Sequence, residues 1–260
     1  MRLERCDVGN GDLQLYADKK RPNTPRYLNI GAGGFYHPYW HNLDQPSAWY
    51  ALAQGEHVHI THDLTSQVAF PLESETLKVA YTSHVVEHLR DEDAQHMFTE
   101  SFRCLQINGF FRIICPDIDV EYEAYLRRDL AFWYWPSPYG AISIEQRFLE
   151  HFASALSINH PNELQEKYQD NQIREVFRRL TKEEALDFFT KQVLVTVQKK
   201  YPGNHMNWFN SRKLHRMLYR AGFKNIWDSR YGQSKCSLLR NTKLFDNTHP
   251  EFSLYIECQK

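Results

Sequence analysis

Two closely spaced glycines follow the first strongly apolar segment of the chain. Residues 27–30 have the composition of a buried strand and continue directly into Gly31-Ala32-Gly33-Gly34. Glycine has no Cβ, so a turn at Gly31 and Gly33 can be sharp and can bring the backbone close to a ligand. A strand that runs into such a turn predicts a cofactor site.

Acidic residues end the next two strand-like segments. Asp44 closes the segment 40–44, and Asp63 follows the segment 57–60. A carboxylate at the end of a strand can accept hydrogen bonds from both hydroxyls of a ribose, as in dinucleotide-binding folds. Each acid can alternatively serve only its own loop, as a cap or in a turn.

Histidines and one further acid follow the later strands. His84 begins a run that also contains His88, Asp117 follows the segment 110–115, and His205 lies in a loop before a late helix. Histidine exchanges a proton near neutral pH, so these residues are candidates for a general base. Structural roles compete, since His88 can anchor a loop and Asp117 can cap a helix.

Strands alternate with helices over most of the chain. Strand-like segments are 27–30, 40–44, 57–60, 77–83, 110–115, 223–227 and 252–257, and helical patterns cover 91–107, 121–130, 143–157, 162–180, 182–200 and 211–221. We expect Asn108-Gly109 to stop the helix 91–107. The alternation predicts an α/β fold with a doubly wound, mostly parallel sheet, whose ligands bind at the carboxyl ends of the strands.

Residues 118–200 carry helical patterns and no strand, with an aromatic, proline-rich stretch at 132–139. We expect a helical insertion or cap within a single domain that spans residues 1–260. Residues 1–25 form an N-terminal lead-in, with a hairpin around residues 9–11. Aromatic faces suit sugar rings, although Phe132 and Trp133 are expected in the core.

The motifs, in this order, resemble those of the class I S-adenosylmethionine-dependent methyltransferases. They are LNIGAG at 28–33, NLD at 42–44, DL at 63–64, SHVVEHL at 83–89 and GFFRIICPD at 109–117. The chain is more narrowly similar to type 11-like methyltransferases of polysaccharide and glycan biosynthesis, with further support from the block 205–257. The resemblance covers residues 26–120 and 201–260 and implies a Rossmann-like, seven-stranded, mostly parallel sheet.

The resemblance implies a cofactor, S-adenosyl-L-methionine, with S-adenosyl-L-homocysteine as its product. The residues expected to contact it are Asn29, Gly31, Ala32, Gly33, Asp44, Asp63, Leu64, Ser83 and His84. In the family the glycine turn faces the methionine part, an acid placed like Asp63 meets the adenine amino group, and the next residue packs on the ring.

The first crossover departs from the pattern of the family. Only ten residues separate Gly33 from Asp44, and Pro38 lies among them. Proline breaks helices, so no full helix is expected there. We expect the aromatic residues Phe35, Tyr36, Tyr39 and Trp40 to wall the cofactor instead.

Methyl transfer to an alcohol requires an in-line arrangement of donor and acceptor and the removal of the hydroxyl proton. We expect the catalytic residues to be among His84, Asp117, His205 and His88. A metal site formed by His84, His88, Asp117 and Asp119 lacks a recognised ligand spacing. No metal is therefore predicted.

Composition excludes several classes of protein. The 31 basic and 32 acidic residues give a net charge of -1, which argues against a nucleic-acid acceptor. The five cysteines are far apart and form no CxxC pair, which favours reduced thiols. No segment approaches the ~20 apolar residues of a membrane helix, and the charged N-terminus does not resemble a signal peptide. A cytoplasmic protein without a membrane span is expected.

We expect an enzyme that O-methylates a sugar hydroxyl of a glycan or of an activated sugar. Two alternatives stay open: an acceptor that is a small metabolite or a protein, and a methyltransferase-fold binding protein without catalysis. A nicotinamide-dependent oxidoreductase is disfavoured, because the third glycine of its fingerprint is missing. A homodimer also stays open.

Overall fold

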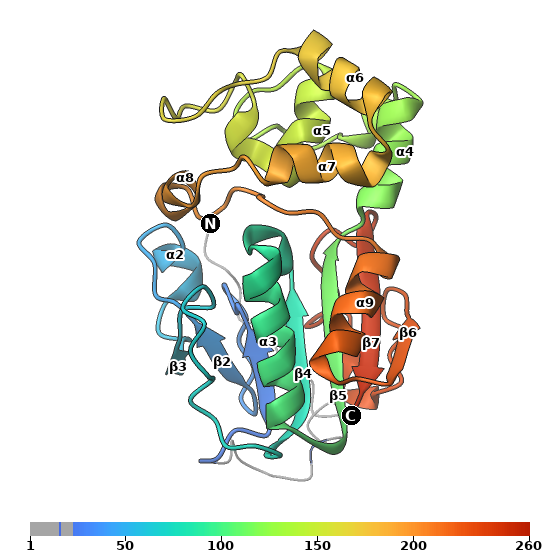
Figure 1. Cartoon of the computed structure of the whole chain (residues 1–260). Helices are drawn as coiled ribbons and strands as arrows, with labels where there is room; N and C mark the ends of the chain where they lie inside the picture. Colours follow the sequence, from blue (N-terminus) through green and yellow to red (C-terminus); the bar gives the residue numbers. More distant parts are fainter. Residues whose placement is uncertain (1–15, 17–22) are drawn as a thin grey trace. The chain divides into compact units, whose positions relative to one another are not determined.

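Seven strands form one sheet in the computed structural model, which describes Tyr16 and residues 23–260. The strands are β1 (Tyr27–Ile30), β2 (His41–Asp44), β3 (Ile60–Thr61), β4 (Leu77–Ser83), β5 (Leu105–Pro116), β6 (Asn225–Asp228) and β7 (Ser253–Gln259). Their order is β3-β2-β1-β4-β5-β7-β6 (Figure 1). The predicted lead-in and its hairpin fall almost entirely outside the described residues.

The direction of the strands confirms the predicted fold class. β3, β2, β1, β4 and β5 pair in parallel along the sheet, and β6 runs antiparallel to β7. A mostly parallel sheet with β7 placed between β5 and β6 is the class I methyltransferase form of the Rossmann-like fold.

The α-helices are α2 (Ala51–Gln54), α3 (Asp91–Cys104), α4 (Ile118–Leu126), α5 (Ile144–Ala153), α6 (Asp170–Arg179), α7 (Lys182–Thr190), α8 (Val195–Lys200) and α9 (Ser211–Ala221). Short 3₁₀ turns are η1 (Val86–His88), η2 (Leu130–Phe132), η3 (Ser154–Leu156) and η4 (Ser237–Leu239). Among the residues that the structure describes, every helix is too short or too polar to span a bilayer.

The chain forms two compact units. Unit 1 contains the sheet and consists of the residues up to Val85 together with Asp91–Cys115 and Ser211–Lys260. Unit 2 consists of Val86–Arg90 and Pro116–Asn210. The single domain over residues 1–260 stays a prediction.

In the part of unit 1 that the structure describes, helices cover one face of the sheet and loops cover the other. α3 and α9 pack side by side on the first face (Figure 1). On the opposite face, Tyr27 of β1 and Tyr81 of β4 pack with Trp40 of the first crossover and Phe245 of a C-terminal loop. The crossover after β1 is too short for a helix, so these aromatic loops take over the burial of the second face.

The junction between α3 and β5 differs from the prediction. The helix ends at Cys104 and the strand follows at once, so Asn108 and Gly109 lie inside β5 instead of stopping a helix. Asn108 has a left-handed φ of 66°, and the pairing of β4 with β5 shifts register in this region. The pair Asn108-Gly109 therefore marks a β-bulge, which favours the same residue types as a helix end.

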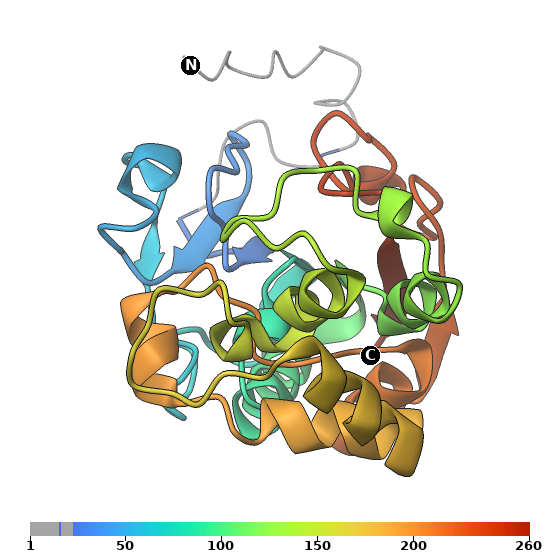
Figure 2. The ribbon, with the colours of Figure 1, turned by 90° about the horizontal axis from the view of Figure 1, so that it is seen from above.

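Unit 2 is a group of helices around α5, which packs against α4, α6 and α7 (Figure 2). Phe148 and Phe152 of α5 are fully buried. Phe177 of α6 packs on Phe148, and Phe189 of α7 packs on Phe152. The helical insertion is thus confirmed as an aromatic-rich helical core.

Two helices of unit 2 are shorter than predicted. The segment 162–180 becomes helical only at Asp170, and the segment 182–200 is divided into α7 and α8. Before α6, Asn162 donates a side-chain hydrogen bond to the Ala155 carbonyl, and Lys167 donates to the same oxygen. Such side-chain bonds to the backbone favour a loop over a helix.

Candidate functional site

The carboxyl ends of β1, β2 and β4 lie together at one edge of the sheet in unit 1. Ile30 of β1 pairs in parallel with Leu43 of β2 and with Thr82 of β4. This register places the residues that follow the three strands next to one another. The predicted cofactor residues at or near this edge are Asn29, Gly31, Ala32, Gly33, Asp44, Ser83 and His84.

The two glycines of the turn after β1 have different physical roles. Both adopt a left-handed φ, 66° at Gly31 and 51° at Gly33. A Cβ on Gly31 would lie 2.4 Å from a methyl group of Val85, so internal packing requires glycine there. A Cβ on Gly33 would meet no heavy atom within 4 Å. The backbone at Gly33 therefore borders open space, which is what the close approach of a ligand needs.

Asp44 connects the glycine turn to the end of β2. Its Oδ2 accepts a hydrogen bond of 3.0 Å from the Gly33 N–H, and its Oδ1 accepts one of 2.8 Å from the Gln45 N–H. The loop-capping role considered from the sequence is thus present. Each carboxylate oxygen has a second lone pair, so Asp44 keeps the capacity to accept ribose hydroxyls, and that contact stays a prediction.

Asp63 lies in a turn after a strand that is shorter than predicted. β3 contains Ile60 and Thr61 only, instead of residues 57–60. The His59 ring accepts the Asn42 N–H through Nδ1 at 3.0 Å, in place of a strand carbonyl, so regular pairing begins only at the next residue.

The Asp63 carboxylate stabilises its own turn. Its Oδ1 accepts hydrogen bonds from the backbone N–H and the hydroxyl of Thr65, at 2.8 and 2.7 Å. This is the turn role that competed with a ligand role. Asp63 is exposed and Leu64 is partly exposed. Their predicted contact with adenine stays a prediction.

The aromatic residues of the first crossover lie mainly in the core, contrary to the expectation that they wall a cofactor. Tyr39 and Trp40 are buried, and Phe35 packs against the same cluster. The Trp40 indole N–H donates a 2.7 Å hydrogen bond to the hydroxyl of Tyr16. Tyr36 differs, since it is exposed and lies against the His57 ring. The described loops cover this face of the sheet, and these rings pack inward against it.

His84 follows β4 in a left-handed conformation, with a φ of 54°. Its Nε2 lies 3.1 Å from the Thr248 carbonyl oxygen and 2.9 Å from the Ser253 hydroxyl. A carbonyl oxygen only accepts, so the neutral ring carries its proton on Nε2 and its lone pair on Nδ1.

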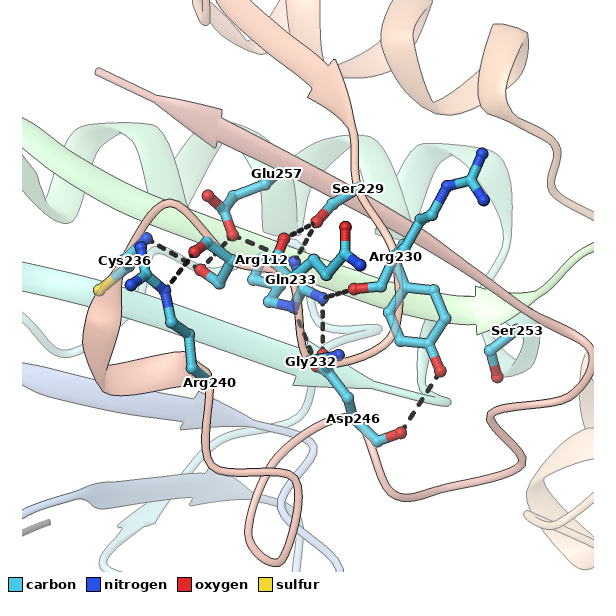
Figure 3. A network of polar contacts seen from close by, with 12 residues as sticks. Arg112, Ser229, Arg230, Gly232, Gln233, Cys236, Arg240, Asp246, Ser253 and Glu257 are labelled. Carbon is cyan, nitrogen blue, oxygen red and sulfur yellow. Dashed lines mark hydrogen bonds and ion pairs between the residues drawn. The ribbon is translucent and has the colours of Figure 1, made fainter.

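A buried arginine in unit 1 orders the C-terminal loop that leads to Ser253. Arg112 of β5 donates two hydrogen bonds to the Asp246 carboxylate, at 2.9 and 2.6 Å, and one of 3.1 Å to Glu257 (Figure 3). It also donates to the Arg230 carbonyl at 2.9 Å. A charged residue inside an apolar strand was the only sequence signal of this network. Its effect is to fix the loop that presents the partners of His84.

Glu87, His88 and His205 form a cluster within unit 2. One potential ligand atom from each side chain lies within 4.8 Å of the other two. The Nε2 of His88 is 4.0 Å from a Glu87 carboxylate oxygen, and the centroids of the two imidazole rings are 4.9 Å apart. Burial and the neighbouring His88 lower the pKa of His205 to about 3, so this ring is neutral. Two predicted catalytic histidines are thus neighbours, and Glu87 joins them.

A second carboxylate–histidine pair adjoins this cluster. The Nδ1 of His151 lies 3.1 Å from Glu121, and the His151 carbonyl oxygen lies 2.7 Å from the Nδ1 of His205. From the sequence, Glu87 was interpreted only as a structural residue of the motif 83–89, and Glu121 was not included, because a single glutamate in a polar segment carries no spacing signal.

Asp117 is the N-cap of α4. Its side chain accepts the Asp119 N–H at 3.0 Å, while Asp119 itself forms a 2.6 Å ion pair with Lys182. Burial raises the pKa of Asp117 to about 6. The capping role is therefore present, and this pKa also suits a general base near neutral pH. A catalytic role for Asp117 stays a prediction.

The aromatic stretch 132–139 divides between core and surface. Trp133 is buried, as expected, and Phe132 is partly buried against the same core. The Tyr139 hydroxyl donates a 2.5 Å hydrogen bond to the Asn204 side chain. Tyr134 is 71% exposed. It is the exposed aromatic side chain of this stretch.

Comparisons with known proteins add distant similarities of fold. No family model and no curated protein matches the chain. Among solved structures, an S-adenosylmethionine-dependent methyltransferase from Mesorhizobium loti is 13% identical, with a TM-score of 0.43 over 96% of this chain and 96% of that chain. One from Archaeoglobus fulgidus is 13% identical, with a TM-score of 0.42 over 96% and 92%.

Human N-acetylserotonin methyltransferase, solved in complex with S-adenosylmethionine, is 12% identical with a TM-score of 0.41. The match covers 96% of this chain and 49% of that chain. Because the sequence identities and TM-scores are this low, the similarities give no information about the activity of this chain. The strand order and the chain's own residues carry the proposals below.

Proposed function

We propose that the chain is an S-adenosylmethionine-dependent methyltransferase. The observation that carries this proposal is the turn after β1: its Gly33 backbone borders open space and is hydrogen bonded to Asp44 at the carboxyl edge of a parallel sheet. Open α/β sheets bind their ligands at this edge. A methyltransferase-fold sheet with such a turn supports a cofactor that combines a nucleoside with a flexible tail.

The residues at the edge fit S-adenosylmethionine. The open space beside Gly33 admits the tail of the cofactor, and the remaining lone pairs of Asp44 suit the two ribose hydroxyls. We assign Asp63 to the adenine amino group and Leu64 to the face of the adenine ring, at the exposed turn after β3. The other proposed contacts are Asn29, Gly31, Ala32, Ser83 and His84.

The bound cofactor supplies a methyl group on a positively charged sulfur, which an acceptor oxygen displaces in line. The protein contributes position and proton transfer. His84 is the base that we favour, since the Thr248 carbonyl leaves the lone pair of the ring on Nδ1. The Nδ1 atom takes the proton of the acceptor hydroxyl. Asp117, His88 and His205 are the other proposed candidates.

We further propose that the acceptor is a sugar hydroxyl, on a glycan or on an activated sugar. Support comes from the exposed ring of Tyr134 in the aromatic stretch of unit 2, because aromatic faces stack on the C–H faces of sugars. The near-neutral net charge of -1 disfavours a nucleic-acid acceptor.

The test is methyl transfer from isotopically labelled S-adenosylmethionine, followed by mass spectrometry. A panel of free sugars, nucleotide sugars and glycan fragments is compared with panels of small metabolites and of proteins. Label in a sugar product supports the proposal. Label that is found only in the metabolite panel or only in the protein panel would assign the acceptor to that class instead. Cofactor binding without transfer to any panel would favour the binding-protein alternative.

A further inference from the structure

We propose that Glu87, His88 and His205 bind a divalent transition-metal ion of the zinc class. The three residues lie wholly within unit 2 and offer two imidazole nitrogens and one carboxylate oxygen. This donor set suits zinc, whereas magnesium and calcium prefer oxygen ligands alone. Glu87 is 2% exposed and His88 is 21% exposed, so the site is sheltered while one ligand still reaches solvent.

Backbone carbonyls hold both imidazoles in the tautomer that metal binding requires. The Nδ1 of His88 lies 2.7 Å from the Asn204 carbonyl oxygen, and the Nδ1 of His205 lies 2.7 Å from the His151 carbonyl oxygen. A carbonyl cannot donate, so each neutral ring carries its proton on Nδ1 and presents the Nε2 lone pair. Metal-binding histidines characteristically donate their second N–H in this way.

The spacing of the side chains is close to that of a filled site. Two imidazoles on one tetrahedral zinc have ring centroids about 5 Å apart, given Zn–N bonds of about 2.0 Å. The rings of His88 and His205 are 4.9 Å apart. The 4.0 Å between His88 Nε2 and Glu87 Oε1 exceeds the roughly 3.3 Å expected between atoms on one zinc. The proposal therefore requires the Glu87 carboxylate to move closer to His88 when the metal binds.

The backbone joins the two segments that carry the ligands. The Glu87 carbonyl oxygen accepts hydrogen bonds from the N–H groups of Met206 and Asn207, at 2.8 and 3.1 Å. The Asn207 side chain in turn donates a 2.8 Å hydrogen bond to the Leu89 carbonyl. The turn with the first two ligands is thereby fixed against the loop with the third, as a preorganised metal site requires.

The proposed set shares only His88 with the ligand set that was considered from the sequence. Asp119, a member of that earlier set, is already paired with Lys182. Three protein ligands leave a fourth zinc position for water or for a small ligand. The three ligands lie in unit 2, and metal binding can be measured without any methyltransferase activity.

The experiment measures metal binding by the whole chain after treatment with a chelator and dialysis. Zn²⁺ is titrated in competition with a chromophoric indicator, and Mg²⁺ serves as the oxygen-preferring comparison. We expect about one zinc ion per chain and no competition from Mg²⁺. His88→Ala and His205→Ala should each weaken binding by about 100-fold, and the isosteric Glu87→Gln by about 10-fold.

His57→Ala is the matched control, because it removes a histidine of unit 1 outside the cluster. It should bind zinc with unchanged affinity, and circular dichroism checks the fold of every variant. Zinc binding that is absent in the unaltered protein, or unchanged in a folded His88→Ala, His205→Ala double variant, would overturn the proposal.

A second measurement tests metal binding even if a variant does not fold. Co²⁺ added to the unaltered chain should give the intense visible absorption of a four-coordinate site. The weak absorption of hexaaqua Co²⁺ alone would contradict the assignment. Both readouts leave the methyltransferase proposal untouched, since neither involves S-adenosylmethionine.

Discussion

The backbone N–H of Gly33 donates a 3.0 Å hydrogen bond to the carboxylate of Asp44. This bond joins the turn after β1 to the end of β2, so the flexible glycine and the acid act as one structural feature. A ligand that approaches the partly exposed Gly33 backbone meets the carboxylate at the same place. The predictions below begin from this relationship.

Gly33→Ala should abolish or strongly weaken binding of S-adenosylhomocysteine. The added methyl group meets no protein atom within 4 Å, so it occupies the space that the ligand needs. The left-handed φ should cost about 1–2 kcal/mol of stability. Calorimetry measures the affinity, and urea unfolding measures the stability.

Gly55→Ala is the matched control for this variant. Gly55 also lies in unit 1, has a φ of 48° and faces open space. Gly55 has a ψ of -131°, which is strained for alanine, so Gly55→Ala should also lose stability, but only Gly33→Ala should lose affinity. Equal affinities in the two variants would remove Gly33 from the cofactor site.

His84→Asn should reduce turnover by about 100-fold or more, which is the usual contribution of a general base. Asparagine tolerates the left-handed backbone at this position, so the fold should be retained. Affinity for S-adenosylhomocysteine should fall far less than turnover. Ser253→Ala, which removes one partner of the ring, should have a much smaller effect, and full activity of His84→Asn would exclude His84 as the base.

Asp117→Asn should separate capping from catalysis. Asparagine still accepts the Asp119 N–H as an N-cap, but it cannot bind a proton. The pKa of Asp117 rises on folding from 3.8 to about 6, so the native protein keeps a proton that the unfolded chain loses. The wild type therefore loses stability as the pH rises from about 4 through 6, and the variant does not.

Relative to the wild type, Asp117→Asn should gain about 2 kcal/mol between pH 4 and pH 8. Urea unfolding at the two values measures the gain. A variant with unchanged turnover would leave Asp117 with its capping role alone, whereas a stability difference that is independent of pH would contradict the raised pKa.

His37 should make the protein less stable in mild acid. Burial lowers its pKa from 6.5 to about 4, so below pH 6.5 the unfolded chain binds a proton that the native ring refuses. Stability is complete above pH 6.5 and falls by up to about 3 kcal/mol as the pH approaches 4. His37→Asn can still accept the Tyr39 N–H and should flatten part of this slope in urea unfolding at pH 7 and pH 5. His160 and His205, whose pKa values are likewise lowered to about 4 and about 3, add to the same slope.

Sequence patterns predicted the sheet because its strands are short apolar runs that end at marked residues. Tyr27–Ile30 ends in glycine and Leu77–Ser83 ends before His84, and both strands have the expected bounds. The predicted end of the helix 91–107 was wrong, because asparagine and glycine occur in β-bulges as well as at helix ends. Periodicity alone cannot distinguish these two uses.

The candidate sites were predictable only where function follows directly from a strand end. Gly33 and Asp44 were found in this way. The cluster of Glu87 and His88 with His205 depends on packing between segments remote in sequence, so no local spacing reveals it. The burial of Trp40 likewise depends on contacts with residues remote in sequence, such as Tyr81 and Phe245.

Calorimetric titration of the purified chain with S-adenosylhomocysteine tests the central claim most directly. We expect saturable binding with about one site per chain, lost in Gly33→Ala and retained in Gly55→Ala. Absence of binding by a chain that circular dichroism shows to be folded would contradict the assignment of the β1 turn and Asp44 as a cofactor site, and with it the proposed methyltransferase activity.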